Sequence, residues 1–284
     1  MTATPPSLSL AGLNALIVGG SSGIGETVAH GCLDAGARVA IAARTPGKLE
    51  AAVEKLSSRD PASRGYVADV TVAHDLERLA QRAVADLGRI DILMNCQGTT
   101  IIKPTLEFTE AEFGHVLTTN LTSVFFCCTT FGRLMIEQGG GAILNIASLA
   151  AHRGWPRACP YAIAKHGIVG LTTTLAAEWA PHAVRVNAIS PGFFMTELNR
   201  HKMPAERKEN ALRRTPVGRF GDLPELVGAA IYLASPAASF TTGQRGRRLP
   251  RKRHLTREVV PPEVFTEPPV QKPGRAVAGP GSPT

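Results

Sequence analysis

The chain has 284 residues, 44% of them hydrophobic and 19% charged, which suits a soluble globular protein with a sizeable core. The first basic residue is Arg38, and no apolar run approaches the ~18 residues that span a bilayer. We therefore expect neither a secretory signal nor a membrane segment, and we expect a cytoplasmic protein. Nine of the 31 Lys and Arg residues, but only three of the 23 Asp and Glu residues, lie in 245–284, so most of the net charge of +8 belongs to this tail.

Strand and helix patterns alternate along the body of the chain. A buried strand is predicted over 14–19, a helix over 23–36, a second strand over 38–43 and a helix that begins at 45–50. A third strand, 65–70, is followed by a helix over about 72–87 and a fourth strand over 90–95. A capping box at Thr109 and Glu112 opens the next helical region, which continues through 121–138.

The remaining elements complete the same alternation. Gly139–Gly141 end the helical region, a fifth strand follows over 142–147, and Pro160 suits the first turn of a helix that extends to 180. A sixth strand is predicted over 185–190. Strands apolar on both faces and separated by helix-length segments indicate a parallel sheet covered on both sides. The fold class is therefore α/β, a single doubly wound (Rossmann) parallel sheet with helices on both faces.

A glycine-rich turn follows the first strand directly. The segment GGSSGIG, 19–25, joins that strand to a helix. Glycines there allow the backbone to approach a pyrophosphate, and the helix N-terminus offers free N–H groups to it. This context favours a dinucleotide site over an ordinary tight turn.

The end of the second predicted strand bears on the cofactor. An NAD site usually has an acidic residue there, which binds the ribose 2′-hydroxyl. Arg44 occupies this place, 19 residues past Gly25. An arginine can hold a 2′-phosphate with paired charged hydrogen bonds, so we expect NADP(H) as the cofactor, with NAD(H) as the alternative. If Arg44 merely faces solvent, it has no role in cofactor recognition.

Several motifs, in order, resemble those of the short-chain dehydrogenases/reductases, and the resemblance covers about Leu10 to Gln244. It implies cofactor binding by residues of the glycine loop, the pair beside the adenine, the NCQG segment, the YxxxK motif and the PG segment: Gly19, Ser21, Ser22, Gly23, Ile24, Gly25, Asp69, Val70, Asn95, Gly98, Tyr161, Lys165, Pro191, Gly192 and Thr196. It also implies four catalytic residues: Asn120, Ser148, Tyr161 and Lys165.

The implied reaction is hydride transfer between a nicotinamide and an alcohol or carbonyl carbon. Tyr161 would move the matching proton, and Lys165, one helical turn on, would lower the pKa of the phenol with its positive charge. Ser148 would bind the substrate oxygen, and Asn120 would fix a water that passes the proton outward through Lys165. Outside this family context, the Tyr161 and Lys165 pair would suit a solvated helix surface.

The sequence also departs from the family pattern. Val18 stands where a threonine is usual before the first glycine, and Gln97 replaces an alanine. The family's seventh strand and its Asp-Gly-Gly turn should follow position 244, but the chain reads RGRRLPRKR. We therefore expect the seventh strand to be missing, as a shift in reading frame would cause. We expect one domain over 1–244 and a disordered, basic, Pro-rich tail over 245–284.

The substrate is less determined. The loop 149–160 and the segment 193–203 should line the pocket, and they mix aromatic residues with His152, Arg153, Arg157 and Arg200. If these cationic side chains face the pocket, they favour a sugar acid, a polyol or a 3-oxoacyl substrate. If they are solvated charges of the loop, they favour no substrate class. We expect a sugar acid or polyol, with a 3-oxoacyl thioester as the alternative.

Two other readings concern the whole protein. Without its seventh strand it would be a poorly active scaffold, and its tail could then bind nucleic acid or an acidic partner, although base-stacking aromatics are lacking there.

Family members commonly form tetramers or dimers through helices around 110–138 and 160–180. Cys127, Cys128 and the phenylalanines at 125–126 would face the sheet or a partner. The five cysteines show no metal-ligand spacing and are expected to be reduced thiols, mostly in the core.

Overall fold

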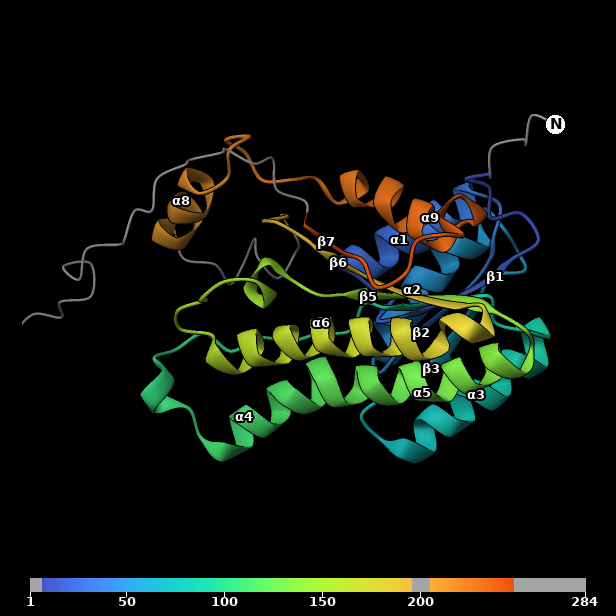
Figure 1. Ribbon diagram of the computed structural model, residues 1–284, viewed down its shortest axis with the longest axis horizontal. Coiled ribbons are helices and arrows are strands. Elements are labelled where there is room, and N and C mark those ends of the chain that lie inside the picture. Colours follow the sequence, from blue (N-terminus) through green and yellow to red (C-terminus); the bar gives the residue numbers. More distant parts are fainter. Residues whose placement is uncertain (1–6, 196–204, 248–284) are drawn as a thin grey trace, which may run out of the picture. The chain divides into compact units, whose positions relative to one another are not determined.

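The computed structural model describes residues 7–195 and 205–247, and a parallel sheet forms its centre (Figure 1). The strand order is β3-β2-β1-β4-β5-β6-β7. The strands are β1 (Asn14–Val18), β2 (Arg38–Ala43), β3 (Arg64–Val67), β4 (Ile92–Asn95), β5 (Gly141–Ile146), β6 (Val184–Ser190) and β7 (Arg245–Arg247). The predicted doubly wound α/β fold is confirmed.

Helices cover both faces of the sheet, as Figure 1 shows. One face packs against α1 (Gly23–Asp34), α2 (Pro46–Ser57) and α9 (Val227–Ala234). The other packs against α3 (Ala73–Leu87), α5 (Ser123–Glu137) and α6 (Cys159–Trp179), and α4 (Glu110–Leu117) contacts α6. A further helix, α8 (Ala205–Arg213), lies beyond the sixth strand, where the sequence analysis made no prediction.

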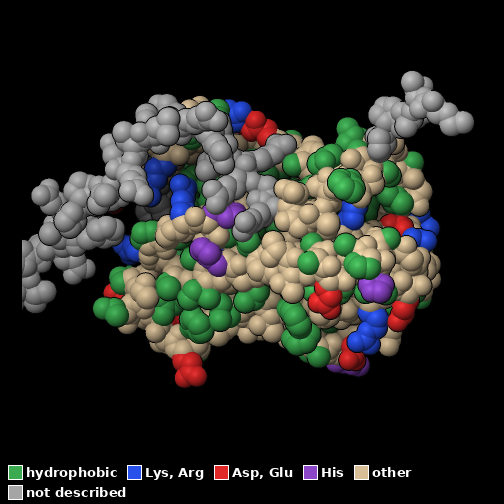
Figure 2. Space-filling view, viewed as in Figure 1, with side chains coloured by type: hydrophobic (Ala, Val, Ile, Leu, Met, Phe, Trp, Pro, Cys, Tyr) green, Lys and Arg blue, Asp and Glu red, His purple; other side chains and the backbone are tan. Residues whose placement is uncertain are grey.

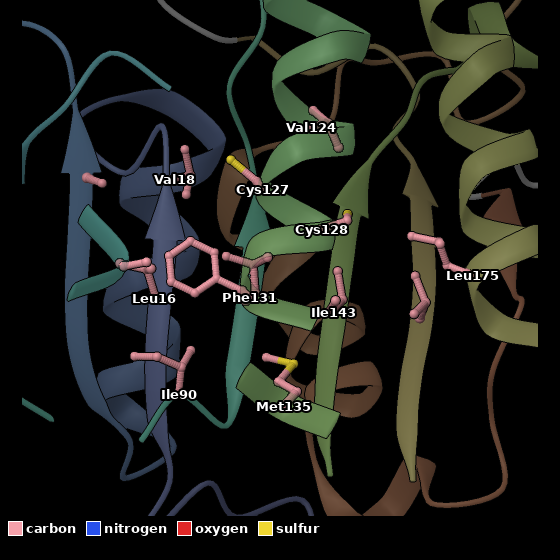
Figure 3. Close-up of a cluster of buried hydrophobic side chains, with 14 of the residues drawn as sticks. Leu16, Val18, Ile90, Val124, Cys127, Cys128, Phe131, Met135, Ile143 and Leu175 are labelled. Carbon is pink, nitrogen blue, oxygen red and sulfur yellow. The ribbon is translucent and has the colours of Figure 1, made fainter. Parts of the chain in front are cut away.

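Helix α5 supplies much of the core on its side of the sheet. Figure 3 shows Phe131, Cys127 and Cys128 of α5 among side chains of the strands, and all three are fully buried. Burying a phenylalanine side chain stabilises the fold by about 1.5–3 kcal/mol. The two cysteines thus face the sheet, whereas Phe125 and Phe126 point outward, with 43% and 51% of their surface exposed.

The prediction that the seventh strand is missing is wrong. Residues 245–247 pair in parallel with residues 188–190 of β6. The N–H of Ala188 donates to the carbonyl of Gln244 at 2.7 Å, and the N–H of Gln244 donates to Oδ1 of Asn187 at 3.0 Å. The prediction relied on alternation of side chains, but a strand ladder uses backbone groups, which any residue except proline supplies in full. The predicted disorder of the tail concerns residues 248–284, which lie outside the described part of the chain.

The topology of the sheet points to the carboxyl ends of its strands as the place where a ligand would bind. Chain order reverses between β1 and β4, which lie side by side with Val18 opposite Asn95. In open parallel sheets, ligands bind outside the carboxyl ends of the strands at such a reversal. The loops that follow β1, β4, β5 and β6 carry seven of the predicted site residues: Gly19, Ser21, Ser22, Gly98, Ser148, Pro191 and Gly192.

Candidate active site

The glycine loop after β1 is packed too closely for side chains at two positions. A Cβ atom on Gly19, whose φ is +75°, would lie 2.7 Å from the backbone nitrogen of Gln97. A Cβ on Gly25 would lie 2.2 Å from the carbonyl oxygen of Gly19. Helix α1 therefore begins directly against the turn. Gly19 also lines an open groove, and a close turn before a helix N-terminus suits a dinucleotide pyrophosphate.

A groove runs from this loop across the ends of β2 and β3. Its walls include Gly19, Ser21, Ser22, Arg44, Asp69 and Val70, all predicted cofactor residues. Strand β3 ends at Val67, three residues earlier than predicted, so Asp69 and Val70 lie in the loop that borders the groove.

Lys48 lies in the same wall as Arg44, and the sequence analysis missed it. It stands in the first turn of α2, four residues after Arg44, and both side chains are exposed. The signal in the sequence was a second basic residue just past the end of β2. Two cations at this end of the groove suit a 2′-phosphate better than one does.

The charge of Asp69 is stabilised where the groove passes it. Partial burial opposes its ionisation, but the hydroxyl and N–H of Thr71 donate to Oδ1 at 2.7 Å and 3.0 Å. Together with the positive charge of Arg44, these bonds hold the pKa of Asp69 below its usual range.

The remaining predicted cofactor residues divide into three groups. Gly98 borders both this groove and the neighbouring cavity, and that cavity is also lined by Ile24, Pro191 and Gly192. Gly23 and Gly25 shape the turn without lining either space. Thr196 lies outside the described residues.

The structure does not bring Asn95 to the groove. Its side chain is 1% exposed, and its Nδ2 donates to Oδ1 of Asn145 at 2.9 Å. Asn145 in turn donates to the hydroxyl of Thr172 at 3.1 Å. Asn95 therefore ties β4 to β5 and α6 inside the core, because its side chain follows the alternation of β4 and not the course of the loop.

The four predicted catalytic residues meet in one cavity beyond the glycine loop. Asn120, Ser148, Tyr161 and Lys165 all line it. Ser148 follows β5 and caps a short 3-10 turn, and Tyr161 and Lys165 come from successive turns of α6. The cavity and the groove share Cys96, Gln97 and Gly98, so a single ligand can extend through both.

Asn120 lies in a break of the helical region that was predicted as continuous. Residues 118–122 form a π-helical turn between α4 and α5, a feature often found at functional sites. Nδ2 donates to the carbonyls of Thr99 and Val116 at 2.9 Å and 2.8 Å, and Oδ1 accepts from the N–H of Thr99 at 3.1 Å. Both amide N–H groups are thus engaged, and only Oδ1 has room for a further partner such as a water.

The net shift of the Tyr161 pKa in the protein alone is upward, whereas the sequence predicted that Lys165 would lower it. Burial raises the pKa of this phenol, and a hydrogen bond with Ser148 opposes the rise. Nζ of Lys165 lies 5.7 Å from the centre of the Tyr161 ring and donates to the carbonyl of Ile146 at 2.7 Å. Burial also lowers the pKa of Lys165 to about 8. Both shifts follow from removing these groups from water.

The outer wall of the cavity is aromatic. Trp155 and Phe193 line it and stack with ring centres 5.5 Å apart. Phe220 meets Phe193 edge-on at 6.2 Å. Of the cationic residues proposed for the pocket, His152, Arg153 and Arg157 do not line the cavity, and Arg200 lies outside the described residues.

Residues 7–195 and 205–247 contain neither a candidate metal site nor a candidate membrane helix. No cluster of His, Cys, Asp or Glu there could hold a metal ion, and the cysteines are free thiols. No helix in this part of the chain is long and apolar enough to cross a membrane.

Comparisons with known proteins agree with this geometry. A family model described as enoyl-(acyl carrier protein) reductase matches residues 18–246. D-threitol dehydrogenase of Mycolicibacterium smegmatis is 37% identical over 82% of this chain and 90% of its own. A short-chain type dehydrogenase/reductase from Mycobacterium marinum aligns with a TM-score of 0.80 and 35% identity, over 84% of this chain and 94% of its own. A gluconate 5-dehydrogenase from Burkholderia cenocepacia, solved with NADP and tartrate, aligns with a TM-score of 0.81 and 35% identity over the same shares.

Proposed function

Because the chain belongs to the short-chain dehydrogenase/reductase family of NAD(P)-dependent oxidoreductases that act on CH–OH groups, we propose that it interconverts an alcohol and a ketone of a sugar-like substrate and prefers NADP(H). The observation that carries this proposal is the meeting of Ser148, Tyr161 and Lys165 in a cavity continuous with the glycine-loop groove.

The cofactor would lie along the groove with its pyrophosphate at the glycine loop and its nicotinamide end toward Tyr161. The close packing at Gly19 and Gly25 supports this placement, since a side chain at either position would collide with neighbouring backbone and displace the loop. When bound, the nicotinamide accepts or supplies the hydride. Arg44 and Lys48 would hold the 2′-phosphate, and for that reason we propose NADP(H) as the preferred cofactor.

Tyr161 would hold the proton that leaves or joins the substrate oxygen. Ser148 partly offsets the rise in the pKa of Tyr161, and both residues line the cavity, so both hydroxyls can hydrogen bond to one substrate oxygen. Lys165, fixed on the carbonyl of Ile146, would support the phenolate when the phenol gives up its proton. Asn120 would fix the loop that carries Thr99 beside this site.

The sugar-like substrate is supported by relatives that are named for threitol and gluconate. A second candidate is a 3-oxoacyl thioester. It is supported by a relative named 3-oxoacyl-(acyl-carrier-protein) reductase, which is 32% identical over 81% of this chain, and by the apolar wall formed by Ile102, Trp155 and Phe193.

Both substrate candidates are tested with a panel of polyols, sugar acids and a 3-oxoacyl thioester. Each compound is assayed with NADP(H) and with NAD(H) by the absorbance of the reduced nicotinamide. Turnover of polyols or sugar acids with NADP(H) preferred is expected. Turnover of the thioester alone would replace the first candidate by the second, and turnover of none would refute both.

We also propose that the protein forms a homo-oligomer through α4, α5 and α6. Phe113, Phe125, Phe126 and Ile163 of these helices are each about 40–50% exposed, and Figure 2 shows hydrophobic side chains grouped over this part of the molecule. Such a patch suits an interface between copies. A mass by size-exclusion chromatography with light scattering equal to one chain would refute this.

A further inference from the structure

A guanidinium group lies against the wall of the substrate cavity. The central carbon of the Arg153 guanidinium lies 5.3 Å from the centre of the Trp155 ring, and this ring lines the cavity. Trp155 is itself held by its stack on Phe193. A positive charge is therefore fixed beside the cavity, in the loop that joins Ser148 to Tyr161.

No negative charge balances Arg153 within the described part of the chain. It takes part in none of the ion pairs there, and its Nε is buried without a hydrogen-bond partner. Burial and, after it, the positive charge of Arg214 lower the pKa of Arg153. Buried donors are nearly always paired in proteins, so an unpaired one calls for an explanation.

The cavity itself supplies no counter-charge either. None of its lining residues among those described is acidic, and Lys165 is its one charged residue. An anion beside the Arg153 guanidinium would supply the counter-charge that the described residues lack and would offset the repulsion from Arg214. The contact of the Arg153 guanidinium with the Trp155 ring does not by itself explain the missing counter-charge or the repulsion from Arg214.

We propose that Arg153 binds an anionic group at the end of the substrate remote from the reacting carbon, so that the enzyme selects a polyhydroxy acid or phosphate over a neutral polyol. This inference rests on the proposed function, because it assigns the substrate class of the same cavity. Arginine suits the role because its planar fork matches both carboxylate and phosphate.

The test compares three six-carbon probes: D-glucitol, D-gluconate and D-glucitol 1-phosphate. They differ at one end in a neutral, a carboxylate or a phosphate group. The wild type is compared with Arg153→Met, which keeps an unbranched side chain and removes the charge, with Arg153→Lys, which keeps the charge, and with Arg214→Met. Arg38→Met removes one charge at the amino end of β2, where the side chain is exposed, and serves as the control. Binding is measured independently of turnover from the fluorescence of Trp155, with Trp155→Phe identifying its signal.

We expect the wild type to prefer one of the anionic probes. Arg153→Met should lower kcat/KM for that probe about tenfold and change the value for glucitol less than twofold. Arg153→Lys should retain part of the preference, and Arg38→Met all of it. The preferred anion identifies the group as carboxylate or phosphate. An equal loss for glucitol and the anions in Arg153→Met would overturn the inference and leave the proposed function intact.

The binding measurement separates the two failures. If no probe is turned over but an anionic probe binds in a manner that requires Arg153, the proposed function fails and the anion site stands. If there is neither turnover nor binding that depends on Arg153, both fail.

Discussion

Nε2 of His152 and the hydroxyl oxygen of Ser190 lie 2.8 Å apart, which joins the loop after β5 to the end of β6. Ser190 is fully buried and directly precedes Pro191 and Gly192, which line the cavity. A second bond, from the N–H of Leu149 to the carbonyl of Pro191, runs beside it at 3.3 Å. The loop that bears Ser148 and the segment after β6 are thus held together by a side-chain pair as well as by backbone.

The His152 and Ser190 pair should position both cavity walls. We expect Ser190→Ala to lower kcat/KM about tenfold through kcat, because small displacements of reacting groups are costly in rate. His152→Gln, which can still hydrogen bond, should retain more activity than His152→Leu. His166→Gln on the exposed side of α6 is the control. Steady-state kinetics with a thermal unfolding curve for each variant check this, and unchanged kinetics in Ser190→Ala would contradict it.

Removing the phenol oxygen of Tyr161 tests the proton-transfer role. Tyr161→Phe keeps the ring but leaves nothing to hold the proton, so kcat should fall about 100- to 10,000-fold. The affinity for NADPH, measured from its fluorescence, should change less than threefold. Retention of most activity would show that another group moves the proton.

The pKa of Tyr161 gives a prediction with a definite sign. Because burial raises this pKa, the phenolate of Tyr161 should appear only above the ordinary value of about 10 in an ultraviolet difference titration of wild type against Tyr161→Phe. The hydrogen bond with Ser148 opposes the rise, so Ser148→Ala should move the titration to still higher pH. Alcohol oxidation needs the phenolate, and its kcat/KM should therefore increase with pH. A phenolate already present near neutral pH in the protein alone would contradict this explanation.

Arg44 is expected to decide between the two cofactors. Arg44→Asp replaces a cation by a carboxylate that repels a 2′-phosphate, so the ratio of kcat/KM for NADP to that for NAD should fall at least tenfold. Lys48→Glu should shift the ratio in the same direction by less. The control Arg38→Asp reverses a charge at the opposite end of β2, where the side chain is exposed, and should leave the ratio unchanged. An unaltered ratio in Arg44→Asp would remove this residue from cofactor recognition.

Gly25 tests the close packing of the glycine loop. A Cβ there would lie 2.2 Å from the carbonyl oxygen of Gly19, so Gly25→Ala should displace the turn. We expect a loss of about 1–3 kcal/mol in the free energy of unfolding and at least tenfold weaker NADPH binding. Gly47→Ala in α2, where a Cβ meets nothing within 4 Å, should instead stabilise the protein slightly. Denaturant unfolding and NADPH titration measure both, and wild-type behaviour of Gly25→Ala would refute the steric argument.

Much of the site was predictable because its information is local. The spacing of Tyr161 and Lys165 places them on one face of any helix, and glycines after a strand mark the loop wherever the strand lies. Asn95 shows the limit of such reasoning. Its motif position suggested the cofactor, but the direction of its side chain depends on the pleat of β4 and on Asn145 across the strand pair. Lys48 is the opposite case, a groove residue that no motif indicated, because the course of α2 brings it to the same groove as Arg44.

The sequence by itself determined the parallel α/β architecture, because hydrophobic period is a property of the chain alone, and its resemblance to a family implied the four residues expected to do the chemistry. Only the tertiary structure decided that β7 forms, that Asn120 lies in a π-helical turn, and that burial raises the pKa of Tyr161. Each of these depends on which groups meet across long separations in the chain and on how much water they exclude. Strand pairing through backbone atoms and desolvation by distant neighbours leave no periodic trace in the sequence.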